Sequence, residues 1–302
     1  MENYLSSGAS RTSARASGSN GTAPLQNLGA RLDPAAERRL EKTLRGQGDR
    51  IFARAPDEVG QIVAAGRAAV PMLISSMNYV DPGDSLHVAC TAVGLGIKIV
   101  KTDPAAVDDF IAALQSRPPA APARYLVDVL DQAEDLRGRT KVEQAMGGLL
   151  AEGRRLRQDE ATKAEGTMYC KLAISTLGRM GSLKALRDTV DLLDDPSKEI
   201  RMSAGTALIH ASGRPELSSG KRNRMLAHKI LESLKADSPF SAGKVEVLTR
   251  GHFTEAVDHY LQAADTAQIA QSFDIRALHY LCNRFFLQKG NFREMVFELL
   301  KS

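Results

Sequence analysis

The chain has 302 residues, more than one compact core usually holds, so we expect either two domains or one elongated array. A net charge of +4 and a pI near 8.9 are only mildly basic, too weak a balance to indicate a nucleic-acid-binding protein. Tryptophan is absent and aromatic residues make up 5%, while Ala, Leu, Arg, Glu and Lys are abundant, which favours helices over a β-rich fold.

The three cysteines, Cys90, Cys170 and Cys282, are far apart in the sequence. An odd, scattered set argues against a disulfide framework and against a zinc cluster, so we expect small buried thiols in a reducing, cytoplasmic compartment. No run approaches the roughly 18 apolar residues that cross a membrane. The first five residues are followed by Ser and Gly rather than by the apolar core of a signal peptide.

Residues 1–32 are rich in Ser, Gly, Ala and Thr and contain no acidic residue between Glu2 and Asp33. Such a segment buries too little apolar surface to offset the entropy of ordering it, so we predict a flexible tail. The composition favours a linker or tether, and a targeting signal is the alternative because acid-poor segments rich in Ser and Arg sometimes act as one.

The dipeptide Asp-Pro occurs at four places where a helix is expected to begin, with the aspartates at Asp33, Asp81, Asp103 and Asp195. The carboxylate accepts hydrogen bonds from free backbone N–H groups, and proline supplies a φ that suits the first turn. Between the breakers, the apolar periodicity predicts helices in antiparallel pairs. The pairs are 67–79 with 84–100, 104–115 with 120–136, 139–152 with 158–180, 182–193 with 197–212, and 222–236 with 241–249.

The first helices of these pairs begin close to forty residues apart, and the segments after Asp81 and Asp195 resemble each other at an offset of 114, or three times 38. Periods of this size are typical of stacked helix-pair arrays. Residues 172–213 carry a more specific pattern of a helix, a short acidic turn, Ile-Arg, and then Ala and Ala-Leu. The residues of this pattern are Asp194, Asp195, Pro196, Ile200, Arg201, Ala204, Ala207 and Leu208.

This pattern resembles the HEAT repeat, and residues 66–97 resemble a degenerate copy in which His87 stands where the family prefers Arg. The resemblance implies an all-α fold, a right-handed α-α superhelix over residues 33–240. It also implies that Asp195 and Arg201 take part in a ladder of bonds between neighbouring turns. We expect residues 241–302 to form a C-terminal helical extension. Within it, Gly251–Val257 and Gly290–Val296 match at an offset of 39 and resemble tetratricopeptide-type hairpins.

What the HEAT resemblance implies about function is a non-enzymatic scaffold or adaptor that binds a protein partner across the concave face of the array. The second helix of each pair lines that face. The expected partner-binding residues are Lys198, Arg201, Met202, Thr206 and His210.

A basic cluster follows this repeat, and its members include Arg214, Arg222, Arg224 and Lys229. A solvated edge is the favoured interpretation, because acidic residues are about as numerous along the chain, and binding of phosphates or of an acidic protein is the alternative. The alternative function is a nucleic-acid-binding HEAT-like enzyme of the alkylpurine DNA glycosylase type. Those enzymes rely on Trp beside a catalytic carboxylate, and this chain has no Trp.

The sequence offers no catalytic constellation. No phosphate-binding loop, G-x-S-x-G or H-E-x-x-H motif occurs, and the histidines lack a second His or Cys at the spacing of a metal pair. A pigment-lyase-type HEAT protein would need an acidic or His site that the sequence does not reveal. We therefore expect no catalytic, cofactor-binding or metal-binding residues, a protein partner, and no favoured role for nucleic acid.

Overall fold

The structure is a computed structural model that describes residues 32–47, 50–78, 85–132, 136–214, 219–234 and 240–257. Throughout these ranges the regular elements are helices and no strand occurs, which confirms the predicted all-α class. Several expectations fall outside the described residues. They concern residues 1–31, the helix start at Asp81, Cys282 and the second hairpin copy at Gly290–Val296.

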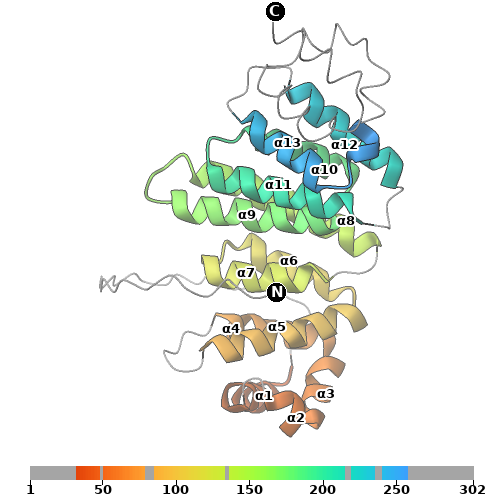
Figure 1. Ribbon diagram of the computed structural model, residues 1–302. Coiled ribbons are helices and arrows are strands. Elements are labelled where there is room, and N and C mark those ends of the chain that lie inside the picture. The colour runs from red at the N-terminus through yellow and green to blue at the C-terminus, as the bar shows by residue number, and fades with distance from the viewer. Residues whose placement is uncertain are drawn as a thin grey trace, which may run out of the picture.

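The helices follow one another along the length of the molecule from α1 at one end to α13 at the other (Figure 1). The N-terminal elements are α1 (Pro34–Gln47), α2 (Ile51–Arg54), α3 (Pro56–Ala64), η2 (Gly66–Ala69), α4 (Val70–Met77) and α5 (Ser85–Thr102). The central elements are α6 (Ala106–Gln115), α7 (Ala120–Leu130), α8 (Leu136–Leu156) and α9 (Lys163–Met180). The last are α10 (Leu183–Val190), η3 (Asp191–Asp194), α11 (Lys198–Ser212), α12 (Ser219–Leu234) and α13 (Ser241–Arg250).

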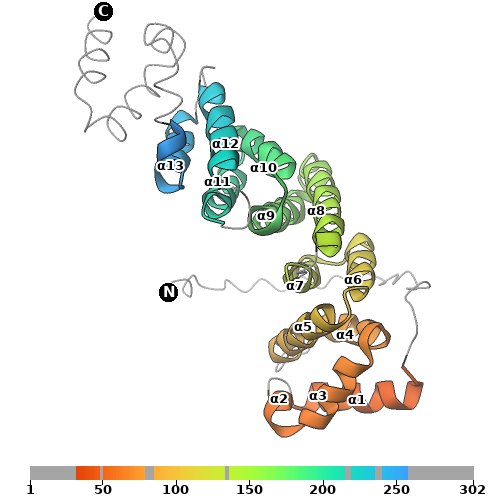
Figure 2. The same ribbon diagram turned by 90° about the vertical axis from the view of Figure 1, so that its right-hand side faces the viewer.

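Figure 2 shows that the helices from α4 onward form two layers. The first helices of the pairs (α4, α6, α8, α10 and α12) lie on one side, and the second helices (α5, α7, α9, α11 and α13) lie on the other. Each second helix packs on the next one along the stack, and the stack bends toward this second layer. The predicted pairing of helices is therefore observed, while the right-handed superhelical twist stays a prediction.

At two of the Asp-Pro dipeptides, the aspartate caps the start of a helix. The Asp33 carboxylate accepts hydrogen bonds from the backbone N–H groups of Ala35 and Ala36, both at 3.2 Å, at the start of α1. Asp103 accepts from the N–H of Ala105 at 3.2 Å, just before α6. These bonds satisfy N–H groups that have no partner inside the helix.

Some helix boundaries differ from those predicted. α7 ends at Leu130 rather than near 136, and α9 begins at Lys163 rather than at 158. The late start of α9 has a local cause, because Thr162 Oγ1 donates to the carbonyl of Leu156 at 2.7 Å and holds the intervening residues in turns. Helices α1 to α3 precede the pairs that the periodicity predicted.

Helices α8, α9 and α11 approach one another closely through small residues. A Cβ atom built on Gly166 of α9 lies 2.5 Å from the carbonyl oxygen of Gly153 in α8. A Cβ built on Gly178 lies 2.6 Å from both the Cα and the Cβ of Ala207 in α11. The absence of a side chain at these glycines lets the helix backbones meet.

The buried apolar residues form one continuous core from α1 to α13. On α11 it contains Ile200, Ala204, Ala207 and Leu208, at the spacing of one helical face. Val245 and Leu248 of α13 belong to the same core. The predicted boundary at residue 241 therefore does not interrupt the packing, and α13 stacks on α11 like the earlier second helices.

Ion pairs join each repeat to the next along the array. Arg157, which follows α8, donates to both oxygens of Asp195 at 2.8 and 2.6 Å, across 38 residues of sequence. Further inter-repeat pairs include Arg67 with Asp109, Lys141 with Asp108, Lys229 with Asp191, and Lys244 with Asp194. A ladder is thus present, and Asp195 takes part in it through Arg157 of the preceding repeat. Arg201 instead donates to the carbonyls of Asp195 and Pro196 in its own turn, so the expected bond from Arg201 to a neighbouring turn is not the one observed.

The two cysteines of the described ranges differ in exposure. Cys170 is buried, whereas Cys90 is exposed, so the prediction of a buried thiol is wrong for Cys90. Neither thiol forms a disulfide bond.

In the part of the chain that the structure describes, no single helix is both long and apolar enough to span a membrane. The bent pair Pro56–Ala64 and Gly66–Met77, at 112°, meets those criteria only when the two helices are taken together.

Candidate functional site

The outward face of α11 brings together the five residues predicted to bind a partner. Lys198, Met202, Thr206 and His210 are exposed, and Arg201 is half-buried. Met202 is 62% exposed, and the only other large apolar side chain exposed within the described ranges is Phe52, at 39%. The helical phase predicted for α11 is confirmed, since Ala204 and Ala207 are buried while these residues face outward.

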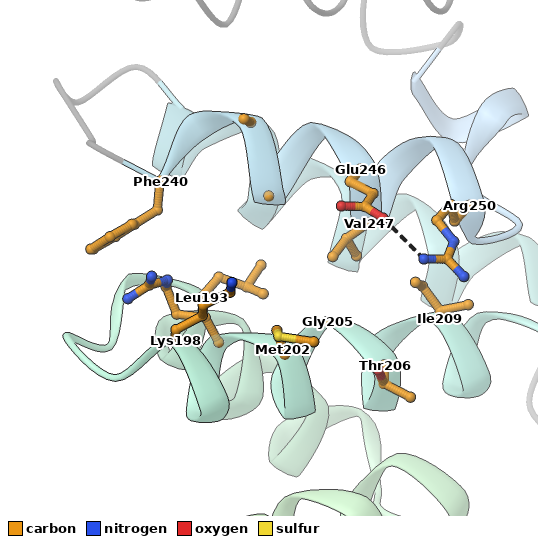
Figure 3. Close-up of a pocket in the computed structure, with 13 residues that line it drawn as sticks. Leu193, Lys198, Met202, Gly205, Thr206, Ile209, Phe240, Glu246, Val247 and Arg250 are labelled. Atoms are coloured by element: carbon orange, nitrogen blue, oxygen red, sulfur yellow. Dashed lines mark hydrogen bonds and ion pairs between the residues drawn. The ribbon is translucent and has the colours of Figure 1, made fainter. Parts of the chain in front are cut away.

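A groove of about 350 Å³ lies between α11 and α13, and we call it the α11–α13 groove (Figure 3). Helix α11 runs along one wall and α13 along the other. Its lining residues are Leu193, Lys198, Arg201, Met202, Gly205, Thr206, Ile209, Phe240, Ala242, Gly243, Glu246, Val247 and Arg250. The middle of the groove is apolar, and charged side chains stand at its two ends.

One end of the groove is built on the stacked pair Arg201 and Phe240. The guanidinium carbon of Arg201 lies 3.7 Å from the centroid of the Phe240 ring, a cation–π arrangement. Nη1 of the same guanidinium donates to the carbonyls of Asp195, at 2.7 Å, and Pro196, at 2.9 Å. The ring and the two carbonyls hold the guanidinium in one orientation, and Lys198 stands beside it one turn earlier on α11.

The other end of the groove carries a self-neutralised pair. Nη1 of Arg250 lies 2.9 Å from the carboxylate of Glu246, one turn away on α13, and Figure 3 shows this contact as a dashed line. Both side chains are more than half exposed. This end therefore adds little net charge to the groove.

A second groove, of about 400 Å³, lies on the opposite flank of α11 against α9, and we call it the α9–α11 groove. Met202 and Thr206 line both grooves, so the exposed face of α11 is a ridge between two hollows. Most of the residues that line the second groove are of polar or charged types. Its residues include Lys171 and Glu199, which form an ion pair at 2.9 Å, with Arg179 and His210 toward its other end.

Beneath this groove Arg179 reaches from α9 to the buried Asp131 at the end of α7. Burial raises the pKa of Asp131 above its ordinary value, and the nearby guanidinium of Arg179 only partly opposes that effect. Burial raises the pKa of Asp128 for the same reason. The carboxyl groups of α7 thus differ from Asp195, where burial also acts to raise the pKa but hydrogen bonds from Arg157 and Ser197 outweigh it and lower the pKa.

The predicted basic cluster does not form one surface patch. Arg222 is only 3% exposed and donates to the carbonyls of Ser212 and Arg214, so its expected place in such a patch is wrong. Burial also lowers the pKa of Arg222. Arg214 donates to the carbonyls of Arg179 and Gly181. Lys229 pairs with Asp191 at 2.7 Å, while Arg224 is exposed and donates to the carbonyl of Gly220.

Sequence reasoning missed the α13 wall of the groove, including Phe240, Glu246 and Arg250. The periodicity does predict a helix at 241–249, but no pattern within it indicates that Phe240 stacks on a side chain 39 residues earlier. An aromatic residue just before a predicted helix and an arginine just inside the preceding second helix were the only available signals.

Within the described ranges, no three His, Cys, Asp or Glu side chains lie close enough together to hold a metal ion. Comparisons of the chain with protein-family models, with curated proteins and with solved structures found no match.

Proposed function

We propose that this protein is a non-enzymatic scaffold, built from HEAT-like helix pairs, that binds a protein partner through the exposed face of α11 and its two grooves. The observation that carries the proposal is Met202, an apolar side chain 62% exposed on a ridge between two hollows. An exposed, adaptable apolar side chain with concave surface on both sides and a charged rim is typical of a protein-binding surface.

The arrangement of cations supports a protein partner over nucleic acid. Duplex DNA is bound by several cations that reach phosphates together. Of the four predicted members of the basic cluster, Arg222 is buried, while Arg214 and Lys229 bond to backbone carbonyls or to a carboxylate. Arg224 alone does not form a phosphate-binding surface, so the glycosylase-type alternative is not favoured. We also propose a cytoplasmic location, because the free thiols of Cys90 and Cys170 suit a reducing compartment.

Met202→Lys tests the proposal by placing a long charged side chain on the ridge. Proteins that crosslink to the full-length chain in cells are quantified by mass spectrometry for the wild type and for the variant. The matched control is Gln144→Lys, at an exposed position in the middle of α8 in the other layer. We expect at least one crosslinked protein to fall by about tenfold or more with Met202→Lys alone, as for the loss of a central apolar anchor.

Both variants should melt at the wild-type temperature, because both positions are exposed. An identical set of crosslinked proteins for wild type and Met202→Lys would reject the proposal.

A further inference from the structure

The α11–α13 groove holds a guanidinium that is oriented but not neutralised. Arg201 stacks on Phe240, and its Nη1 is occupied by two backbone carbonyls. No carboxylate of the described residues binds it, because Glu199, two residues earlier, pairs with Lys171, and Asp195 accepts from Arg157 with both oxygens. Among the described residues, none accepts a hydrogen bond from the Nε–H or Nη2–H groups of Arg201, and a ligand carboxylate can use them. A planar guanidinium fixed in this way suits a carboxylate, since little side-chain entropy is lost on binding.

Lys198 adds a second cation at the same end of the groove. It is exposed, and no ion pair joins it to a carboxylate in the described part of the chain. The acidic residues near the groove are engaged elsewhere, Glu246 with Arg250 and Glu199 with Lys171. Counted over the described residues, the end of the groove beside Phe240 therefore carries an excess of positive charge, which favours an acidic ligand.

The middle of the groove is apolar and open. Met202, Ile209 and Val247 contribute apolar side chains to it. At the start of the α13 wall the residues are the small Ala242 and Gly243. A Cβ built on Gly243 meets nothing within 4 Å, so the backbone of another segment can approach there. The lining positions of α11 run from residue 198 to residue 209, about 16 Å at 1.5 Å per residue, which corresponds to about three helical turns.

We infer that this groove binds an acidic amphipathic helix of about three turns from the partner protein. Apolar side chains of that helix, at i, i+4 and i+7, lie on Met202, Ile209 and Val247. A carboxylate near its end is received by Arg201 and Lys198, and Phe240 positions the guanidinium. This inference rests on the proposed function, because it assigns a ligand class to the same face of α11.

Selection from a displayed library of random peptides tests the inference. Peptides of about 16 residues span ~24 Å when helical and cover the whole groove. The full-length chain is the bait, in parallel with Lys198→Glu. The matched control is Lys184→Glu, a lysine that is also exposed and lies near the start of α10 in the other layer. We expect enriched peptides to combine apolar residues at helical spacing with at least one Asp or Glu, and we expect Lys198→Glu, unlike Lys184→Glu, to abolish their enrichment.

An enriched peptide is then synthesised with a fluorescent label, and its affinity is measured by anisotropy. Replacement of its acidic residues by Gln should weaken binding to the wild type by about tenfold or more, as expected for loss of a charge-assisted hydrogen bond. Arg201→Lys keeps the charge but loses the planar fork and should weaken binding of the acidic peptide by a similar factor, with little effect on the Gln peptide. This difference between the two peptides separates a ligand contact from a folding defect.

Enriched peptides that are neutral or basic, that bind Lys198→Glu as well as the wild type, or an absence of enrichment would each overturn the inference. Neutral peptides whose binding is lost with Met202→Lys would leave the scaffold proposal standing and remove only the acidic preference. An unchanged set of crosslinked proteins with Met202→Lys would reject the scaffold proposal itself.

Discussion

The two flanks of α11 are built differently. Toward α9 the helix backbones meet, because Gly178 faces Ala207 without a side chain between them. Toward α13 the nearest approach is looser, since a Cβ on Gly205 lies 3.0 Å from a methyl group of Val247, and the groove opens beside it. One helix thus makes a tight seam with α9, which fixes the repeat, and a looser contact with α13, and a groove lies beside each contact. Whether a glycine faces backbone or a side chain decides how closely the two helices approach.

The largest loss of stability is expected at the contact between Gly178 of α9 and Ala207 of α11, where the helix backbones meet. Gly178→Ala places a Cβ 2.6 Å from the Cα of Ala207, and backbone cannot move aside as a side chain does. We expect a loss of about 2–3 kcal/mol in the free energy of unfolding, measured by urea denaturation. Gly243→Ala on the open wall is the control and should stabilise α13 by about 0.5–1 kcal/mol, because alanine favours helix. Equal effects of the same sign would refute the contrast between the flanks.

Ala204→Leu probes the buried face of α11 itself. Ala204 is fully buried, so the larger side chain must displace its neighbours at a cost of about 1–3 kcal/mol in the free energy of unfolding. Lys198→Ala, on the exposed face of the same helix, should cost under roughly 0.5 kcal/mol. Thermal and urea denaturation of both variants measure the difference, and similar costs would mean that the assigned helical phase is wrong.

Two aspartates that pair with arginines should respond to acid in opposite directions. The pKa of Asp195 is lowered in the folded state, so its ionised form stabilises the fold above the ordinary pKa of 3.8 and that contribution is lost as the pH falls through the folded value. The pKa of Asp131 is raised, so the folded state favours its protonated form and stability falls as the pH rises from 3.8 through the raised pKa.

Urea denaturation at several pH values, for Asp195→Asn and Asp131→Asn beside the wild type, measures both effects. The stability advantage of the wild type over Asp195→Asn should grow as the pH rises toward and through 3.8. The stability advantage of the wild type over Asp131→Asn should shrink as the pH rises above 3.8. Parallel pH profiles for the two variants would contradict the different balance of burial and hydrogen bonding described for the two carboxyl groups.

The smallest change in stability is expected at Gly205, on the flank of α11 that faces α13. Gly205→Ala places a Cβ 3.0 Å from a methyl group of Val247, a side chain that can shift by a few tenths of an ångström beside an open groove. The gain in helix propensity offsets the crowding, so we expect the stability to stay within about 0.5 kcal/mol of the wild type. A loss comparable to that of Gly178→Ala would show that this flank is as tightly packed as the seam.

The sequence alone determined the features that depend on neighbours along the chain. The apolar periodicity placed the helix pairs from residue 67 onward close to their observed positions, and the phase of α11 followed from the spacing of Ala204, Ala207 and Leu208. Asp33 and Asp103 mark helix starts because a carboxylate reaches the backbone N–H groups two or three residues away. These interactions span a few residues, so the sequence contains all that is needed to infer them.

The tertiary structure alone decided which side chains meet across repeats. The Asp195 carboxylate binds Arg157 of the preceding repeat, and the guanidinium of Arg201 stacks on Phe240 of the following one. The tertiary structure also buries Arg222 against backbone carbonyls, although its place in a charged cluster had suggested a solvated edge. Arg157 and Arg201 meet partners 38 and 39 residues away, and Arg222 meets carbonyls of the preceding helix region 8 and 10 residues away. Their distances depend on how the helices pack, a property that helical periodicity does not specify.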